Sequence, residues 1–132
     1  MNSTITLTAD FEDLKNKHRN QQHFDVCERI TVESKDVYIR YMNLMNELRV
    51  EVSYTSDVGN ELNIIMSRHG FYSYHVNHYI SEFYPTIEES LNRLIRPLSD
   101  TLFTVFIELS NAIYRNLFQV DKSHVLETTV DV

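Results

Sequence analysis

Apolar residues recur at intervals of three and four along much of the chain, which is the spacing of one face of an α-helix. After Ser34, the apolar positions of this kind are Val37, Tyr38, Tyr41, Leu44, Met45 and Leu48. The stretch from Ser56 to Gly70 shows the same spacing, and so does the stretch from Phe71 to Pro85. The pattern therefore predicts three consecutive helices, and Gly70 would end or bend the second of them.

One short stretch has a different period. Arg49–Tyr54 alternates between polar and apolar side chains, as a half-buried strand does. We interpret it as the continuation of the helix that begins near Ser34. A strand at this position is the alternative.

Capping patterns indicate three further helices. Thr8 can cap a helix that contains Phe11 and Leu14, and Thr86 with Glu89 has the spacing of a capping box. Ser99 can cap a last helix, whose apolar positions are Leu102, Phe103, Phe106, Ile107, Leu109, Ile113, Tyr114, Leu117 and Phe118. A helix that is apolar over so much of its circumference is typical of a central position.

The predicted fold is therefore an all-α, compact helical bundle of about six helices. Only two glycines and two prolines interrupt the chain, and no linker or repeat divides it. We expect one domain over residues 1–132, with flexible ends at 1–8 and 121–132.

Charge and composition narrow the classes of partner. A formal net charge of −7 opposes binding to a phosphate backbone, so we expect no nucleic acid. The single Cys27 fits a reducing compartment, and neither a secretory signal nor a membrane span is predicted. A cytoplasmic protein is the expectation.

Candidate chemistry is sparse. No sequence motif for a catalytic nucleophile or a phosphate-binding loop is present, so we expect neither an enzyme nor a cofactor. His75, His78 and Glu82 would project from one side of a helix, as a metal site requires. A solvated polar stripe of an amphipathic helix explains the same three residues more simply, and it is the interpretation that we favour.

Two segments carry a resemblance to a known family. Asn60-Glu61-Leu62 is followed, after seven intervening residues, by Gly70-Phe71, and residues 100–109 read Asp-Thr-Leu-Phe-Thr-Val-Phe-Ile-Glu-Leu. In spacing and order these segments resemble the first and second homology regions of Bcl-2 family apoptosis regulators, in a divergent, virus-type form. A third homology region is not found. Phe71 stands where the family has an arginine, and Arg68 lies close enough to replace it.

The resemblance implies a central apolar helix and a hydrophobic groove that holds the amphipathic BH3 helix of a pro-apoptotic protein. Glycine at position 70 would let the partner backbone approach closely. The implied groove residues are Tyr41, Met45, Leu48, Leu62, Met66, Arg68, Gly70, Phe71 and Tyr74. The implied function is inhibition of apoptosis with a narrow ligand range, in the host cytosol if the protein is viral.

Two other functions stay open on the sequence alone. One is a small viral or phage-like all-α adaptor or inhibitor that binds a different host protein. The other is a helical metal-binding protein that uses the histidines and the glutamate named above. In either case, eight tyrosines and seven phenylalanines leave aromatic side chains for a possible homodimer contact.

Overall fold

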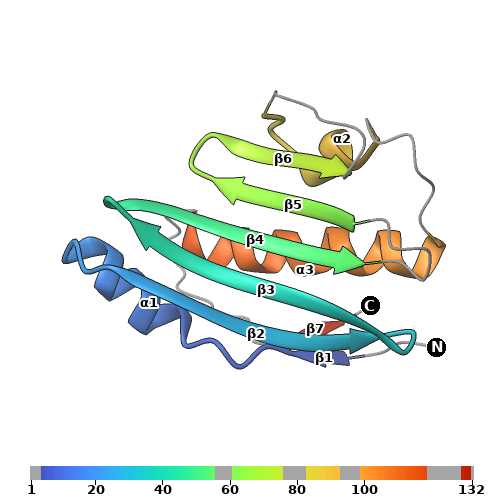
Figure 1. The fold of residues 1–132 in the computed structure, drawn as a ribbon, viewed down its shortest axis with the longest axis horizontal. Coiled ribbons are helices and arrows are strands. Elements are labelled where there is room, and N and C mark those ends of the chain that lie inside the picture. Colours follow the sequence, from blue (N-terminus) through green and yellow to red (C-terminus); the bar gives the residue numbers. More distant parts are fainter. Residues whose placement is uncertain (1–3, 56–60, 76–82, 93–98, 119–128, 132) are drawn as a thin grey trace.

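The computed structural model describes residues 4–55, 61–75, 83–92, 99–118 and 129–131. A five-stranded antiparallel sheet forms one layer, and helices lie against one of its faces (Figure 1). The strands of this sheet are β2 (Phe24–Val32), β3 (Lys35–Leu44), β4 (Glu47–Thr55), β5 (Glu61–Ser67) and β6 (Gly70–His75). The helices are α1 (Phe11–Arg19), α2 (Ile87–Asn92) and α3 (Asp100–Leu117). The prediction of an all-α, Bcl-2-like bundle of about six helices is therefore wrong.

The three helices predicted between Ser34 and Pro85 are replaced by β3, β4, β5 and β6. Each strand pairs with the next along the chain, so the sheet is a simple meander. The alternation in Arg49–Tyr54 was the correct signal, because this stretch lies inside β4. Our interpretation of it as helix is wrong.

The register of the strands divides their side chains between two faces. Val37 pairs with Ile30 on one side and with Tyr54 on the other, so all three point to the same face. This inner face packs against the helices. Its buried side chains include Val37, Ile39, Tyr41, Val50, Val52, Leu62, Ile64, Met66 and Phe71.

Helix α3 covers the inner face, behind the sheet in Figure 1. The predicted cap is confirmed, because the Ser99 hydroxyl accepts a hydrogen bond from the backbone N–H of Leu102. Its buried positions include Leu102, Val105, Phe106, Leu109, Ala112, Ile113 and Leu117. The Phe106 ring meets Tyr54 edge to face, with ring centroids 6.0 Å apart. This helix is central to the core, although the core is shared with a sheet.

The other capping predictions have mixed outcomes. Thr86 and Glu89 do interact at the start of α2, where the Thr86 hydroxyl accepts from the Glu89 N–H at 3.2 Å. Helix α1, however, is capped by Asp10, whose carboxylate accepts from the Asp13 N–H. The hydroxyl and N–H of Thr8 both bond to the Glu28 carboxylate instead.

The two ends of the chain, which we expected to be flexible, contribute a second, small sheet. Strand β1 (Thr4–Thr6) pairs with β7 (Thr129–Asp131) in antiparallel orientation. Leu7, directly after β1, is 3% exposed and belongs to the hydrophobic core.

Candidate functional site

Four segments far apart in the sequence meet at one end of the molecule, on the left in Figure 1. They are the last turn of α1, the β3–β4 turn, the β5–β6 turn and the end of α3. Between them lies a pocket of about 380 Å³, which we call the terminal pocket. The described residues that line it are His18, Asn46, Glu47, Leu48, Arg68, Leu117 and Phe118.

The terminal pocket combines apolar and charged lining residues. Leu48 and Leu117 are buried at 7% and 8% exposure and belong to the hydrophobic core. Glu47 and Arg68 are exposed, and the Arg68 Nε lies 3.9 Å from the Glu47 carboxylate. Such a mixture suits an apolar group that enters while its polar neighbours stay in solvent.

The side chain of His18 is held in a defined orientation. Asn43 is 1% exposed, and its amide nitrogen donates to the backbone oxygen of Gln22 at 2.7 Å. The amide oxygen of Asn43 therefore faces the Nδ1 of His18, 2.9 Å away, and accepts its proton. These bonds join the end of α1 to the end of β3. The Nε2 of His18 takes no part in the bond to Asn43.

The β3–β4 turn carries an apolar tip beside the terminal pocket. We call Leu44 and Met45 the apolar tip; their side chains are 40% and 100% exposed. Met45 and Asn46, the residues of the turn, have φ angles of +52° and +62°. Positive φ at both positions matches the twist of a hairpin and normally selects Asn-Gly. A methionine here costs about 1 kcal/mol and contributes no packing in return.

The structure places Gly70 and Phe71 in a hairpin, so their predicted roles in a groove or at a helix end are wrong. Gly70 follows the β5–β6 turn with a φ of +115°. A Cβ at this position would collide with the backbone carbonyl oxygen of Tyr84 and lie 3.2 Å from its carbon. The backbones of Phe71 and Tyr84 exchange two hydrogen bonds of 2.7 Å. Glycine is required because the chain passes directly over this turn.

Most of the other predicted groove residues lie in the core. Tyr41, Leu62, Met66 and Phe71 are between 0% and 4% exposed on the inner face of the sheet. The Phe71 ring packs on Tyr114 of α3, with centroids 4.9 Å apart. These residues hold the sheet to the helices, and the groove predicted from them is replaced by packed core.

Tyr41 combines burial with a polar bond. Its hydroxyl donates to the Glu28 carboxylate at 2.8 Å, and that carboxylate also accepts from the N–H groups of Thr8 and Ala9. Burial, reinforced by the charge of Glu28, raises the pKa of Tyr41 far above its ordinary value. The cluster ties the segment before α1 to the sheet.

Three predicted residues do gather at one place. Leu48 and Arg68 line the terminal pocket, and Met45 of the apolar tip is adjacent to Asn46, which also lines it. The sequence reasoning missed His18, Asn46, Glu47, Leu117 and Phe118. The alternation that begins at Glu47 was the available signal, because a strand there requires a turn before it.

The remaining predicted residues do not form a site that can be described. Tyr74 and His75 belong to β6. His78 and Glu82 lie outside the described residues. Within the described part of the chain, no group of histidine, cysteine and carboxylate side chains is arranged to hold a metal ion.

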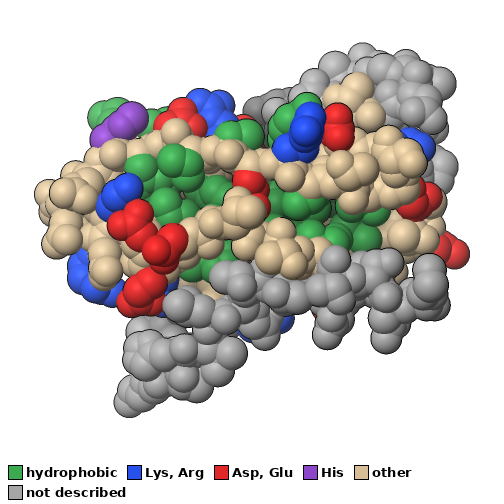
Figure 2. Space-filling view, turned by 90° about the horizontal axis from the view of Figure 1, so that it is seen from below, with side chains coloured by type: hydrophobic (Ala, Val, Ile, Leu, Met, Phe, Trp, Pro, Cys, Tyr) green, Lys and Arg blue, Asp and Glu red, His purple; other side chains and the backbone are tan. Residues whose placement is uncertain are grey.

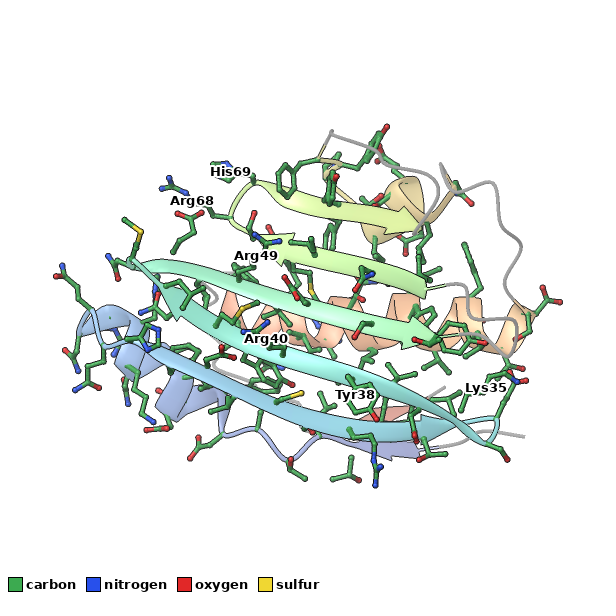
Figure 3. The ribbon with its side chains drawn as sticks, in the orientation of Figure 1. Lys35, Tyr38, Arg40, Arg49, Arg68 and His69 are labelled. Atoms are coloured by element: carbon green, nitrogen blue, oxygen red, sulfur yellow. The ribbon has the colours of Figure 1, made fainter. Side chains whose placement is uncertain are left out.

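Two basic side chains on the outer face of the sheet, Arg40 and Arg49, lie beside carboxylates (Figure 3). Arg40 binds Asp25 through two hydrogen bonds of 2.8 and 2.6 Å, and Arg49 lies 3.3 Å from Glu51. The bond to Arg40 lowers the pKa of Asp25, and the same bond raises the pKa of Arg40. Pairing of this kind removes much of the attraction that these cations would exert on a phosphate.

Neither a protein-family model, a curated protein nor a solved structure matches this chain. Among the described helices, none has both the length and the hydropathy needed to cross a bilayer.

Proposed function

We propose that this protein is a non-catalytic interaction module that binds an amphipathic helical segment of a partner protein at the terminal pocket and the apolar tip. The observation that supports the proposal most strongly is the exposure and the backbone conformation of Met45. Its side chain is fully exposed, stands on a turn with unfavourable φ, and adjoins a pocket with an apolar floor. Strained and exposed apolar residues of this kind are retained at functional sites.

The size of the terminal pocket sets what it accepts. A volume of about 380 Å³ lies near the lower end of the range for ligand pockets, about 300–1,000 Å³. It suits one or two apolar side chains of a partner. Met45, which is flexible and polarisable, is suited to cover such an anchor from one side.

The charged residues at the rim of the terminal pocket suit the polar side of the partner's amphipathic helix. Glu47 lies 3.9 Å from the Arg68 Nε and 3.8 Å from the His69 Nε2. Because these pairs are exposed and long, a partner can replace them at little cost. Binding of a BH3 helix stays a prediction. We propose that the terminal pocket, and not the groove predicted from the sequence, would bind such a helix.

NMR titration of the ¹⁵N-labelled protein tests the proposal. The probes are helical peptides with apolar residues at i, i+3/i+4 and i+7, BH3 sequences among them, together with scrambled peptides of the same composition. With some of the amphipathic peptides, we expect changes in amide chemical shift centred on His18, Asn46, Glu47, Leu48 and Arg68. The scrambled peptides should cause none. No response to any peptide overturns the proposal.

A matched pair of variants separates the apolar tip from the backbone strain. Met45→Gly and Ser34→Gly both place glycine at a positive φ in a two-residue turn of β3, at opposite ends of that strand. Met45→Gly should weaken peptide binding at least about tenfold, since it removes the apolar side chain that covers the partner's anchor. Ser34→Gly should leave binding unchanged. Equal binding by the wild type and both variants would exclude the apolar tip from the site.

A further inference from the structure

The two edges of the five-stranded sheet differ in how they are covered. At the β6 edge, the backbone of Phe71 is bonded in both directions to Tyr84. At the opposite edge, β2 has β3 as its neighbour, and no other described strand pairs with it. Strand β2 is nine residues long and contains no proline. A long edge strand with free backbone groups is a template for pairing with another chain.

The register of β2 shows which of its residues have free backbone groups. Glu33 and Ser34 form the turn to β3, and its hydrogen bond joins Val32 to Lys35. Hydrogen-bonded pairs then alternate along the two strands. The residues that direct their N–H and C=O groups away from β3 are therefore Asp25, Cys27, Arg29 and Thr31. The side chains of all four are exposed on the outer face.

The order of these side chains is complementary to itself. In an antiparallel pair of two β2 strands centred on Cys27, Asp25 of each copy lies opposite Arg29 of the other. The two neighbouring registers lack this match. A pairing centred on Glu28 sets the two Glu28 carboxylates opposite each other, and a pairing centred on Val26 sets Arg29 opposite His23 instead of Asp25. Opposite charges across a strand pair favour a register, and like charges disfavour it.

We propose that two copies of this chain associate by antiparallel pairing of their β2 strands, with Cys27 at the twofold axis. The two sheets then form one continuous sheet. On the inner side, Val26, which is 43% exposed at this edge, then lies opposite Glu28 of the other copy. Figure 2 views the molecule from the side on which α1, β1 and β2 lie, and it shows hydrophobic side chains between charged ones on this face. The proposal uses none of the residues of the terminal pocket and does not depend on the proposed function.

Arg29 and Asp25 have different roles in this pairing. Asp25 is already bound by Arg40 of its own chain, and a carboxylate can accept from a second guanidinium at its remaining lone pairs. Arg29 is exposed, and among the described residues it has no carboxylate within ion-pair distance. Substitution of Arg29 therefore removes the intermolecular pairs without breaking a described contact of the monomer.

Sedimentation equilibrium over a concentration series up to about 1 mM tests the proposal. The wild type should show a monomer–dimer equilibrium, and Arg29→Glu should weaken the dimer at least about tenfold because it sets a carboxylate at position 29 against Asp25 of the other copy. Arg49→Glu is the matched control, with the same change of charge on the central strand β4, and should dimerise as the wild type does. Circular dichroism confirms that each variant is folded. A wild type that is monomeric throughout, or an unchanged Arg29→Glu dimer, overturns the proposal.

Oxidative cross-linking tests the register. Cys27 is the only cysteine, so copper–phenanthroline oxidation should yield a covalent dimer that reductant reverses. In the variant Cys27→Ser/Thr31→Cys, the two thiols of the same dimer lie eight residues apart along the strands, which is about 27 Å. This variant should not cross-link at a comparable rate. Equal rates for the two proteins would exclude pairing centred on Cys27.

Discussion

The β3–β4 turn and the β5–β6 turn lie at the same end of the molecule, yet they use opposite residue types. At the β5–β6 turn, the residue with positive φ is Gly70, and the backbone of Tyr84 passes directly over it. At the β3–β4 turn, the positive φ falls on Met45, whose side chain is fully exposed.

The difference shows what each turn is adapted to. Glycine at position 70 is explained by packing, because any Cβ there would meet the covering chain. Methionine at position 45 is not explained by packing, since nothing covers it and glycine or asparagine would suit its φ better. Gly70, which looks functional in the sequence, is structural, whereas Met45 on the other turn belongs to the candidate site.

The largest expected effect is at the covered turn. Phe71→Ala should lower the free energy of unfolding by about 3–5 kcal/mol, because it leaves a cavity against Tyr114 in the core. Leu44→Ala, on the exposed turn, should cost less than about 1 kcal/mol. Urea unfolding measures both. A similar loss for the two variants would remove the distinction between the turns.

Gly70→Ala comes next. The new methyl group strains the backbone and forces Tyr84 away, so we expect a loss of about 2–4 kcal/mol in urea unfolding. Asn46→Ala places alanine at a less extreme positive φ, +62° against +115°, where the side chain is exposed, so its cost sets a lower limit for the strain. It should cost about 1 kcal/mol. If both substitutions cost the same, the contact with Tyr84 contributes nothing.

Met45→Gly should have a small effect of opposite sign. Relief of the positive φ outweighs the extra flexibility of glycine in the unfolded chain, so stability should rise by about 0.5 kcal/mol. Thermal unfolding measures the change, and the peptide titration measures its cost in binding. A loss of stability would show that the Met45 side chain has a structural role.

The smallest effect is expected at Arg68. Its side chain is 75% exposed and its ion pair with Glu47 is 3.9 Å long, so Arg68→Ala should change stability by less than about 0.5 kcal/mol. The same variant should alter peptide binding at the terminal pocket. A loss of several kcal/mol in urea unfolding would contradict this assignment of Arg68 to the rim.

Local patterns predicted some elements well. The last helix has the predicted span and cap, because Ser99 and a long apolar face act within a few turns of one another. The alternation in Arg49–Tyr54 is a true strand signal, since one face of β4 lies on the core and the other is more exposed. Strand β5 lacked such a signal because Asn63, Ile65 and Ser67, on its outer face, are buried as well.

The residue types in the turns also hid the strands from prediction. The few glycines indicated few breaks, yet two turns are formed by Glu33-Ser34 and Met45-Asn46 at positive φ without any glycine. With these breaks hidden, apolar residues spaced three and four apart looked like one helical face. Only the pairing of neighbouring strands over their whole length stabilises turns of this composition.

The sequence by itself determined the last helix, the capping interaction of Thr86 and Glu89, and the net negative charge, because each depends on neighbouring residues or on composition alone. Tertiary structure alone decided that residues 35–75 contain strands, that Tyr84 covers Gly70, and that His18 and Phe118 line one pocket. Each of these depends on contacts between segments distant in sequence. Such contacts select one of two local conformations that differ little in energy.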